Sequence, residues 1–317
     1  MSSRRFRFGV GPAGLHGHEP QSTGPGWAQL CRRIEDLGYD AINVGDHLDD
    51  RLGPIAALMA AGCATDTLAL GVFMLSNDYR HPAVLAKELA TVDALSGGRL
   101  EVGLGAGWLA ADYERAGLTF DAAGRRVDRL AEAVSVLKLL FAGGDGHFEG
   151  EHYQLRGLPG LPLPGRRPHP RLALGGGGRR VLSLAGREAD IVAFNVNLGH
   201  GVMGAPAGES ATAAATEQKV QWVRDAAGPR FDDVELQVYV HVVDVTEDVA
   251  GAAERLAPRL GVSIADVTAS PHVLLGSVEE IAETLEQRRE RFGFSYVSVS
   301  ATVIDEFAPV VELLSGR

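Results

Sequence analysis

The sequence predicts an α/β fold, a (β/α)8 barrel (TIM barrel) with insertions at the C-terminal face of its strands. Short β-rich runs alternate with helical patterns along nearly all of the 317 residues, and such alternation favours a parallel sheet. Eight strands that are each followed by a helix close most naturally into a barrel, with a doubly wound open sheet as the alternative. Barrels of this size commonly form one domain, so we expect a single domain over residues 1–317.

Each expected strand is a β-rich run ended by glycine or polar residues, and the helices between them show apolar residues at helical spacing. Gly38 suits the position just after the first helix, and Pro82 suits the first position of the third. A small hairpin is expected over 147–155. The eight strands are expected over residues 6–10, 41–44, 68–75, 99–104, 171–174, 191–194, 234–243 and 296–299.

Four unusual stretches, 11–25, 46–53, 105–121 and 195–215, mostly follow strand ends. In a barrel the C-terminal ends of the strands form the active-site face. We therefore expect the functional residues in and around these stretches.

Composition excludes several classes of protein. The chain has 41 acidic and 30 basic side chains, a net charge of −11, which argues against a nucleic-acid binder. No run approaches the ~18 consecutive apolar residues of a membrane helix, and 45% hydrophobic residues are too many for a disordered chain. The 40 glycines show no period of three, which excludes collagen.

Two features indicate a cytoplasmic protein. Cys31 and Cys63 form no CxxC motif and each lies in an apolar helical pattern, so we expect two buried, reduced thiols. Met1-Ser2-Ser3-Arg4-Arg5 leads directly into the first strand, without the apolar core of a signal peptide.

The segment Gly175-Gly176-Gly177-Gly178 joins the fifth expected strand to a helix that begins near Arg179. Glycines here expose backbone N–H groups where the helix dipole is positive, which suits a phosphate. A tight structural turn is the alternative. Cations such as Arg179 and Arg180 oppose the dipole in a first turn, so their presence favours a bound anion.

Two other strand ends carry candidate residues. Gly105-Ala106-Gly107 lets a flat ligand lie close to the backbone. In Asp46-His47-Leu48-Asp49-Asp50, a single histidine poised for proton transfer is the favoured interpretation, with a metal cluster or a surface loop histidine as alternatives. His16-Gly17-His18 resembles the metal pair of barrel hydrolases, but it lies off the strand. No G-x-S-x-G motif supports a serine hydrolase.

Six segments spread over nearly the whole chain carry a resemblance to a known family. They are Trp27 to His47, Arg80-His81-Pro82, Leu95-Ser96-Gly97-Gly98-Arg99, Gly103-Leu104-Gly105-Ala106-Gly107-Trp108, Pro170 to Val192 and Leu275-Gly276-Ser277-Val278-Glu279-Glu280. In combination they resemble the bacterial luciferase-like flavin and deazaflavin oxidoreductases. The resemblance is closest to the branch that uses coenzyme F-420, a deazaflavin, in place of FMN.

The resemblance implies a barrel that holds a flat tricyclic ring at its C-terminal mouth. A non-proline cis peptide near Val72-Phe73 would form a bulge under the ring. Asp46 and His47 match the strand-two pair that faces the ring, and they are the implied catalytic residues. Gly105-Ala106-Gly107 would border the ring, and Gly176 to Arg180 would meet the cofactor phosphate.

The sequence departs from the deazaflavin-dependent sugar-phosphate dehydrogenases of this family at two places. It has Trp108 where they carry an acidic residue, and Asp50-Arg51 where they carry a tryptophan. Oxidation of glucose 6-phosphate is therefore not implied. Trp108 instead indicates a more apolar or aromatic substrate pocket.

These observations predict an F-420-dependent oxidoreductase that transfers a hydride between C5 of the cofactor and a small organic substrate. The alternative is an FMN-dependent two-component monooxygenase, served by a separate reductase. A metal-dependent barrel hydrolase and a non-catalytic relative of the same barrel are more remote alternatives. We expect no metal, and the resemblance implies a homodimer.

Overall fold

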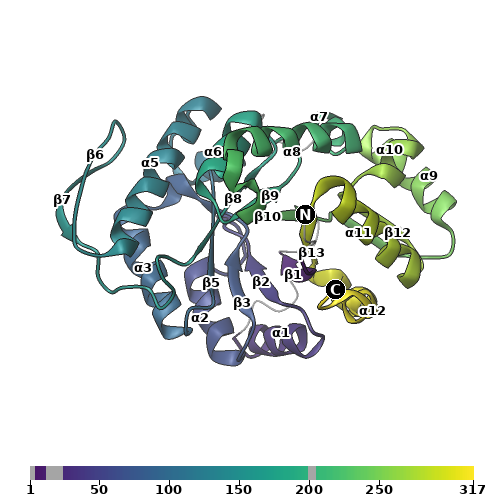
Figure 1. Cartoon of the computed structure of the whole chain (residues 1–317), viewed down its shortest axis with the longest axis horizontal. Coiled ribbons are helices and arrows are strands. Elements are labelled where there is room, and N and C mark those ends of the chain that lie inside the picture. Colours follow the sequence, from purple (N-terminus) through teal and green to yellow (C-terminus); the bar gives the residue numbers. More distant parts are fainter. Residues whose placement is uncertain (1–3, 12–23, 199–204) are drawn as a thin grey trace.

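The structure, a computed structural model, describes residues 4–11, 24–198 and 205–317. Eight parallel strands form a closed barrel, which confirms the predicted fold (Figure 1). The hydrogen-bonded pairing of β3 with β5 closes the ring, so the open-sheet alternative is wrong. In order around the barrel the strands are β1 (Arg7–Gly11), β2 (Ala41–Val44), β3 (Ala69–Val72), β5 (Leu100–Gly105), β8 (Arg171–Gly176), β9 (Ile191–Phe194), β10 (Glu235–Tyr239) and β13 (Phe294–Ser300).

Helices surround the barrel and pack their apolar faces onto it (Figure 1). Pro82 opens its helix as predicted, and Ser277 forms a capping box with Glu280 at the start of another. The longer helices are α1 (Gly24–Asp36), α2 (Pro54–Ala64), α3 (Pro82–Leu95), α5 (Ala123–Ala142), α6 (Arg179–Glu188), α8 (Ala213–Ala227), α9 (Val249–Leu260), α11 (Val278–Phe292) and α12 (Ile304–Leu314). The shorter ones are α4 (Ala110–Ala116), α7 (Ala205–Ser210) and α10 (Ile264–Ala269).

The strand expected over 68–75 is interrupted. β3 ends at Val72, a cis peptide bond joins Phe73 to Met74, and β4 (Leu75–Ser76) then resumes pairing with β5. The expected position of the cis bond, near Val72-Phe73, is therefore wrong by one residue. The backbone leaves the barrel wall only after Phe73, whose N–H still bonds the carbonyl of Val44.

The strand expected over 234–243 is two strands. β10 ends at Tyr239, and β11 (Val242–Val245) leaves the barrel to pair in parallel with β12 (Val273–Gly276). This two-stranded sheet packs with α9, α10 and α11 beside the barrel (Figure 1). The expected hairpin is present as β6 (Asp145–Glu149) and β7 (Gln154–Pro159).

Four charged side chains close the N-terminal end of the barrel. Arg7 lies 2.8 Å from both Glu101 and Glu235, and Arg171 lies 3.2 Å from Glu101 and 2.8 Å from Glu235. Both carboxylates are buried, with side chains 7% and 5% exposed. Each residue stands at or next to the first position of its strand. We call these four residues the charged floor.

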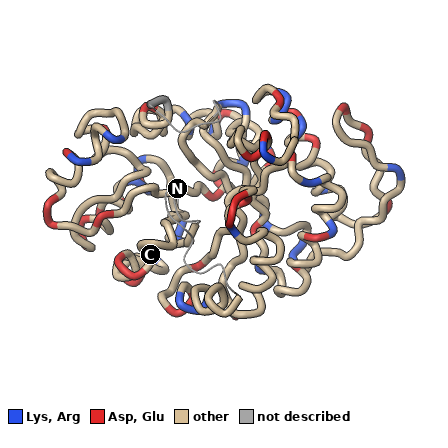
Figure 2. The backbone as a smooth tube through the Cα atoms, turned by 180° about the vertical axis from the view of Figure 1, so that it is seen from behind, with Lys and Arg blue, Asp and Glu red and all other residues tan. Residues whose placement is uncertain are grey.

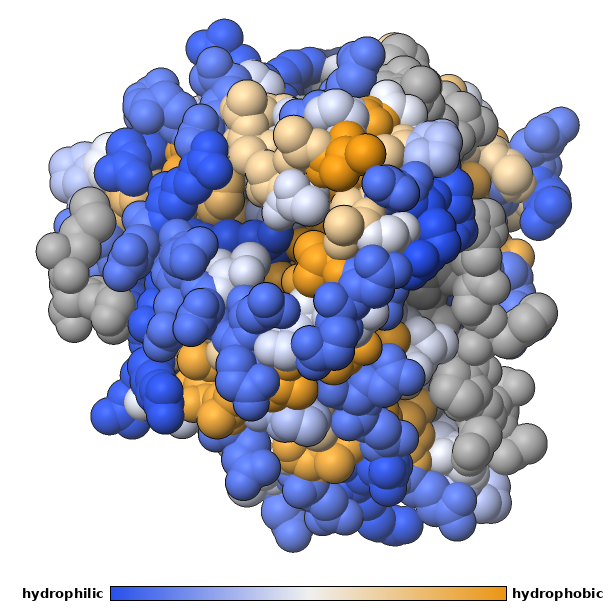
Figure 3. Space-filling model, turned by 90° about the vertical axis from the view of Figure 1, so that its right-hand side faces the viewer, coloured by the Kyte–Doolittle hydropathy of each residue, from blue (hydrophilic) through white to orange (hydrophobic). Residues whose placement is uncertain are grey.

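Acidic and basic residues are interspersed over the described chain (Figure 2). The side that carries α9 to α11 is mostly hydrophilic, with hydrophobic groups between (Figure 3). Within the described residues, no helix is long and apolar enough to cross a membrane. Cys31 is buried as predicted, but Cys63 is exposed. Cys63 belongs to α2, which is apolar on most of its circumference. The periodicity of the sequence therefore could not show that Cys63 faces outward.

Candidate functional site

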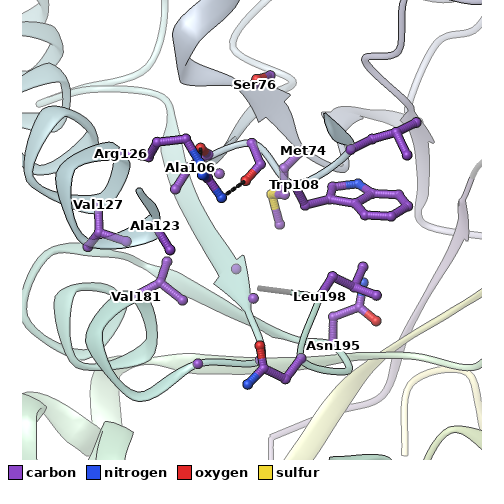
Figure 4. A pocket seen from close by; sticks show the side chains of 18 of the residues that line it. Met74, Ser76, Ala106, Trp108, Ala123, Arg126, Val127, Val181, Asn195 and Leu198 are labelled. Carbon is purple, nitrogen blue, oxygen red and sulfur yellow. Dashed lines mark hydrogen bonds between the residues drawn. The ribbon is translucent and has the colours of Figure 1, made fainter. Parts of the chain in front are cut away.

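A cavity of about 460 Å³ opens at the C-terminal end of the barrel, a size typical of small-molecule sites. Its walls come from the ends of β2, β3, β5, β8, β9 and β10 and from the first turns of α5 and α6. Figure 4 shows Ala123, Val127 and Val181 on one side and Trp108 and Leu198 on another. Every site residue predicted from the sequence lines this cavity except Val72, which is buried at the end of β3.

His47 is held by a buried carboxylate. Its Nδ1 lies 2.8 Å from Oδ2 of Asp112, a residue of α4 that is 1% exposed. The hydroxyl of Tyr79 donates to the same oxygen at 3.2 Å. Since an ionised carboxylate only accepts hydrogen bonds, it favours the tautomer of His47 with the proton on Nδ1. Nε2 is then the acceptor nitrogen available to a ligand.

Asp46 is engaged by three donors. Arg80 forms a bidentate pair with its carboxylate, at 2.7 and 3.1 Å, and the backbone N–H of Ser76 adds a bond of 2.9 Å. Bidentate pairs of this kind are rigid and strong. The contacts therefore favour a positioning role, in which Asp46 holds the segment after the cis bond in place.

The backbone of segment 105–107 lines the cavity and is fixed by hydrogen bonds to Arg126. Arg126, 3% exposed, donates from Nε to the carbonyl of Ala106 at 3.2 Å and also bonds the carbonyl of Gly107 (Figure 4). Gly107 has φ +75°, and a Cβ there would collide with the hydroxyl of Tyr113. The glycine is thus required by the backbone conformation and by the contact with Tyr113; the close approach of a flat ligand stays a prediction. Trp108, the next residue, packs against His47 edge to face, with the two ring centroids 5.8 Å apart.

The glycine-rich corner lies where α6 begins. A Cβ at Gly177 would strike the backbone of Val196, whereas Gly178 has open space beside it. Arg180 pairs with Asp128 of α5 at 2.6 Å, and both side chains are more than half exposed. Arg179 is exposed and has no partner among the described residues. Backbone N–H groups of a helix start and an unpaired cation therefore share one corner of the cavity.

The ends of β9 and β10 contribute a neutral polar pair that the sequence analysis missed. Nε2 of His241 lies 2.9 Å from Oδ1 of Asn195, which also accepts from the N–H of Val196. Burial, with the nearby charge of Lys219, lowers the pKa of His241 to about 4, so this imidazole is neutral near pH 7. Lys219 itself bonds the carbonyl of Asn195, and burial lowers its pKa to about 8.

The metal alternatives receive no support from the part of the chain that the structure describes. No three His, Cys, Asp or Glu side chains converge there in a way that could hold a metal ion. His16-Gly17-His18 lies outside the described residues.

The barrel and its cavity define a class of protein: a (β/α)8 barrel with a cavity of small-molecule size at the C-terminal ends of its strands, where barrel enzymes have their active sites. Residues 7–291 match the model of the luciferase-like monooxygenase family. The chain belongs to this family, as the sequence predicted.

Relatives of both cofactor types match the chain. It is 31% identical over 146 residues to an FMNH(2)-dependent dimethylsulfone monooxygenase of Pseudomonas putida, covering 46% of this chain and 39% of that one. It is 30% identical over 164 residues to an F420-dependent glucose-6-phosphate dehydrogenase of Microbacterium testaceum, covering 49% and 48%. These matches span about half or less of each relative's length.

Among solved structures, the fold resembles the coenzyme F420-dependent tetrahydromethanopterin reductase of Methanopyrus kandleri. The TM-score is 0.77 at 19% identity, over 98% of this chain and 99% of that one. At 19% identity this similarity shows a shared fold and nothing about activity.

Proposed function

We propose that this chain is a coenzyme F-420-dependent oxidoreductase that moves a hydride between C5 of the deazaflavin and a small organic substrate. The observation that carries the proposal is the pairing of His47 with the buried carboxylate of Asp112 at the cavity wall. The glycine-rich start of α6 lines the same cavity. A group that can take up a proton and a helix start that suits a phosphate both support such a reaction.

The residues present fit a flat anionic cofactor. The cavity is lined by more apolar than polar surface, and the glycines of β5 and β8 keep its walls free of side chains. Space beside Gly178 lies next to the N–H groups that begin α6. In this arrangement Arg179 and the first turn of α6 would hold the phosphate, while Phe73, Met74 and segment 105–107 would border the ring.

The chain's own residues would manage the proton and the orientation of the substrate. When bound, the deazaflavin supplies a hydride acceptor or donor at C5. His47 would take the hydroxyl proton that an alcohol substrate loses as the hydride leaves its carbon, and would return it in the reverse reaction. Asp112 holds the imidazole in the required tautomer, with Tyr79 fixing the carboxylate. Trp108 and Leu198 would pack on an apolar or aromatic substrate.

The test is a titration of the purified protein with oxidised F-420 and, separately, with FMN, followed by cofactor fluorescence. We expect F-420 to bind, and a His47→Ala variant to bind it equally well while losing turnover with a panel of secondary and aromatic alcohols. Tight binding of FMN without binding of F-420 would refute the cofactor assignment. Full turnover by His47→Ala would remove His47 from the mechanism.

The second candidate is a two-component monooxygenase that receives reduced FMN from a separate reductase. The similarity to the FMNH(2)-dependent relative, 31% identical over 146 residues, supports it. In that case the protein would consume oxygen when supplied with reduced FMN and a substrate.

We also propose that the protein is a single-domain cytoplasmic protein, and that it is a homodimer, as the family resemblance implies. Light scattering coupled to size-exclusion chromatography would measure the oligomeric state.

A further inference from the structure

A second cavity lies outside the barrel, beside the two-stranded sheet of β11 and β12. Its volume is about 290 Å³, and it is enclosed by α11, the end of α10, β12 and the first residue of α9. It shares no lining residue with the active-site cavity. The elements that enclose it lie at the right of Figure 1, and Figure 3 shows the molecule from that side.

Arg288 of α11 lines this cavity with an almost unsatisfied guanidinium group. The residue is 7% exposed, yet Nη1 has no hydrogen-bond partner among the described residues. Nη2 makes one long contact, 3.5 Å to the carbonyl oxygen of Thr268. Burial lowers the pKa of Arg288 to about 10, so the side chain still carries its charge near neutral pH.

An unpaired buried charge is costly, because the loss of hydration is not repaid by a partner. Among the described residues the other buried arginine, Arg126, bonds three carbonyl oxygens, and the half-buried Arg7 has two carboxylates. Arg288 departs from this rule at the wall of a cavity large enough for a small molecule. Its missing partner is therefore best supplied by a ligand.

The chemistry of the wall indicates which ligand. A guanidinium group offers a planar fork of N–H donors that fits two oxygens of one oxyanion. Thr284 and Gln287 add a hydroxyl and an amide to the wall. Of the two acidic lining residues, Glu280 is turned toward its own helix start, where it accepts from the N–H of Ser277 at 2.8 Å. Glu283 is exposed to solvent, which screens its charge.

We propose that this cavity is a binding site for a small oxyanion, a carboxylate or a phosphate, held by the guanidinium group of Arg288. The site is separate from the cofactor cavity, and it does not depend on which cofactor the protein uses. The anion would complete the hydrogen bonding of Arg288 and link α11 to β12 and α10.

The test uses thermal unfolding of the full cofactor-free protein in sodium phosphate and in sodium acetate, with ionic strength held constant by sodium chloride. A ligand that binds only the folded state raises the midpoint with the logarithm of its concentration, by about 4 °C at a hundredfold excess over Kd for a chain of this length. A response to phosphate alone assigns a phosphate site, and a response to acetate alone assigns a carboxylate site.

Three variants locate the response. Arg288→Met should remove the part of the response that this cavity contributes, leaving at most the part that phosphate gives at the start of α6. It should leave the anion-free protein as stable as the wild type or more so, since it removes an unpaired buried charge. Arg288→Lys keeps the charge without the fork and should weaken the response. Arg179→Gln, which alters the active-site corner, should retain it. No response in the wild type, or an equal response in Arg288→Met, would overturn the proposal.

Discussion

Removing the cation of Arg179 should change two measured quantities in opposite directions. The side chain stands in the first turn of α6, is exposed, and has no partner among the described residues. A cation at this end of a helix opposes the dipole by about 0.3–1 kcal/mol. Arg179→Gln should therefore stabilise the cofactor-free protein by that amount, which corresponds to a rise of roughly 0.5–1.5 °C in Tm for a chain of this length.

The same substitution should weaken cofactor binding. An exposed ion pair between a guanidinium and a phosphate contributes about 0.2–1 kcal/mol, so the Kd for the cofactor should rise by roughly 1.5- to 5-fold. The loss should shrink as salt is added, because exposed charges are screened. Fluorescence titration at two ionic strengths measures the Kd, and differential scanning calorimetry measures the Tm.

Arg187 offers a matched control on the same helix. It lies in the last turn of α6, is exposed, and does not line the cavity. A cation there is favourable to the dipole, so Arg187→Gln should lower the Tm slightly and leave the Kd unchanged. The reasoning is refuted if Arg179→Gln leaves the Kd unchanged, or if both variants change the Kd equally.

Three further predictions concern the barrel and the cavity. Asp112→Asn keeps the shape of the side chain but loses the charged partner of His47, so kcat should fall by roughly 10- to 100-fold with unchanged cofactor Kd; an unchanged kcat in steady-state assays would contradict this role. His241 has a folded pKa of about 4, below its ordinary 6.5, so the unfolded state binds more protons between these values. Its contribution, at most about 3 kcal/mol, should be present above pH 6.5 and lost toward pH 4, and urea unfolding of His241→Gln should show a flatter pH dependence. Gly103→Ala would drive a Cβ into the carbonyl of Val72 and should lower the free energy of unfolding by about 1–3 kcal/mol; equal urea midpoints would show that the wall yields without cost.

The barrel strands could be predicted because each is a β-rich run of four or more residues that ends in glycine or polar residues. β12 was missed because Val273–Gly276 is a short apolar run whose partner, β11, lies outside the barrel. Periodicity cannot separate such a run from part of a buried helix. Similarly, nothing in the sequence marks where the chain leaves the barrel after Tyr239.

The predicted half of the site consists of residues that follow strand ends, namely His47 and the glycines after β5 and β8. The other half, Asp112 and His241, could not be predicted from the spacing of residues in the sequence. Asp112 lies 65 positions from His47 in the sequence. It belongs to α4, a short helix in the segment after β5, and the sequence does not show how this helix is oriented relative to His47. His241 lies within the strand expected over 234–243, and its position in that strand does not show that its side chain faces the cavity. Knowing that β10 ends at Tyr239 would have placed it at the cavity.

The charged floor also bears on how the chain assembles. Its carboxylates and guanidinium groups come from positions 7, 101, 171 and 235, so the cluster is electrically neutral only after β10 has joined the sheet. A chain that stops before Glu235 lacks the carboxylate that pairs with both Arg7 and Arg171. The N-terminal end of the barrel is therefore joined across four separate strands by side-chain ion pairs as well as by the hydrogen bonds between neighbouring strands.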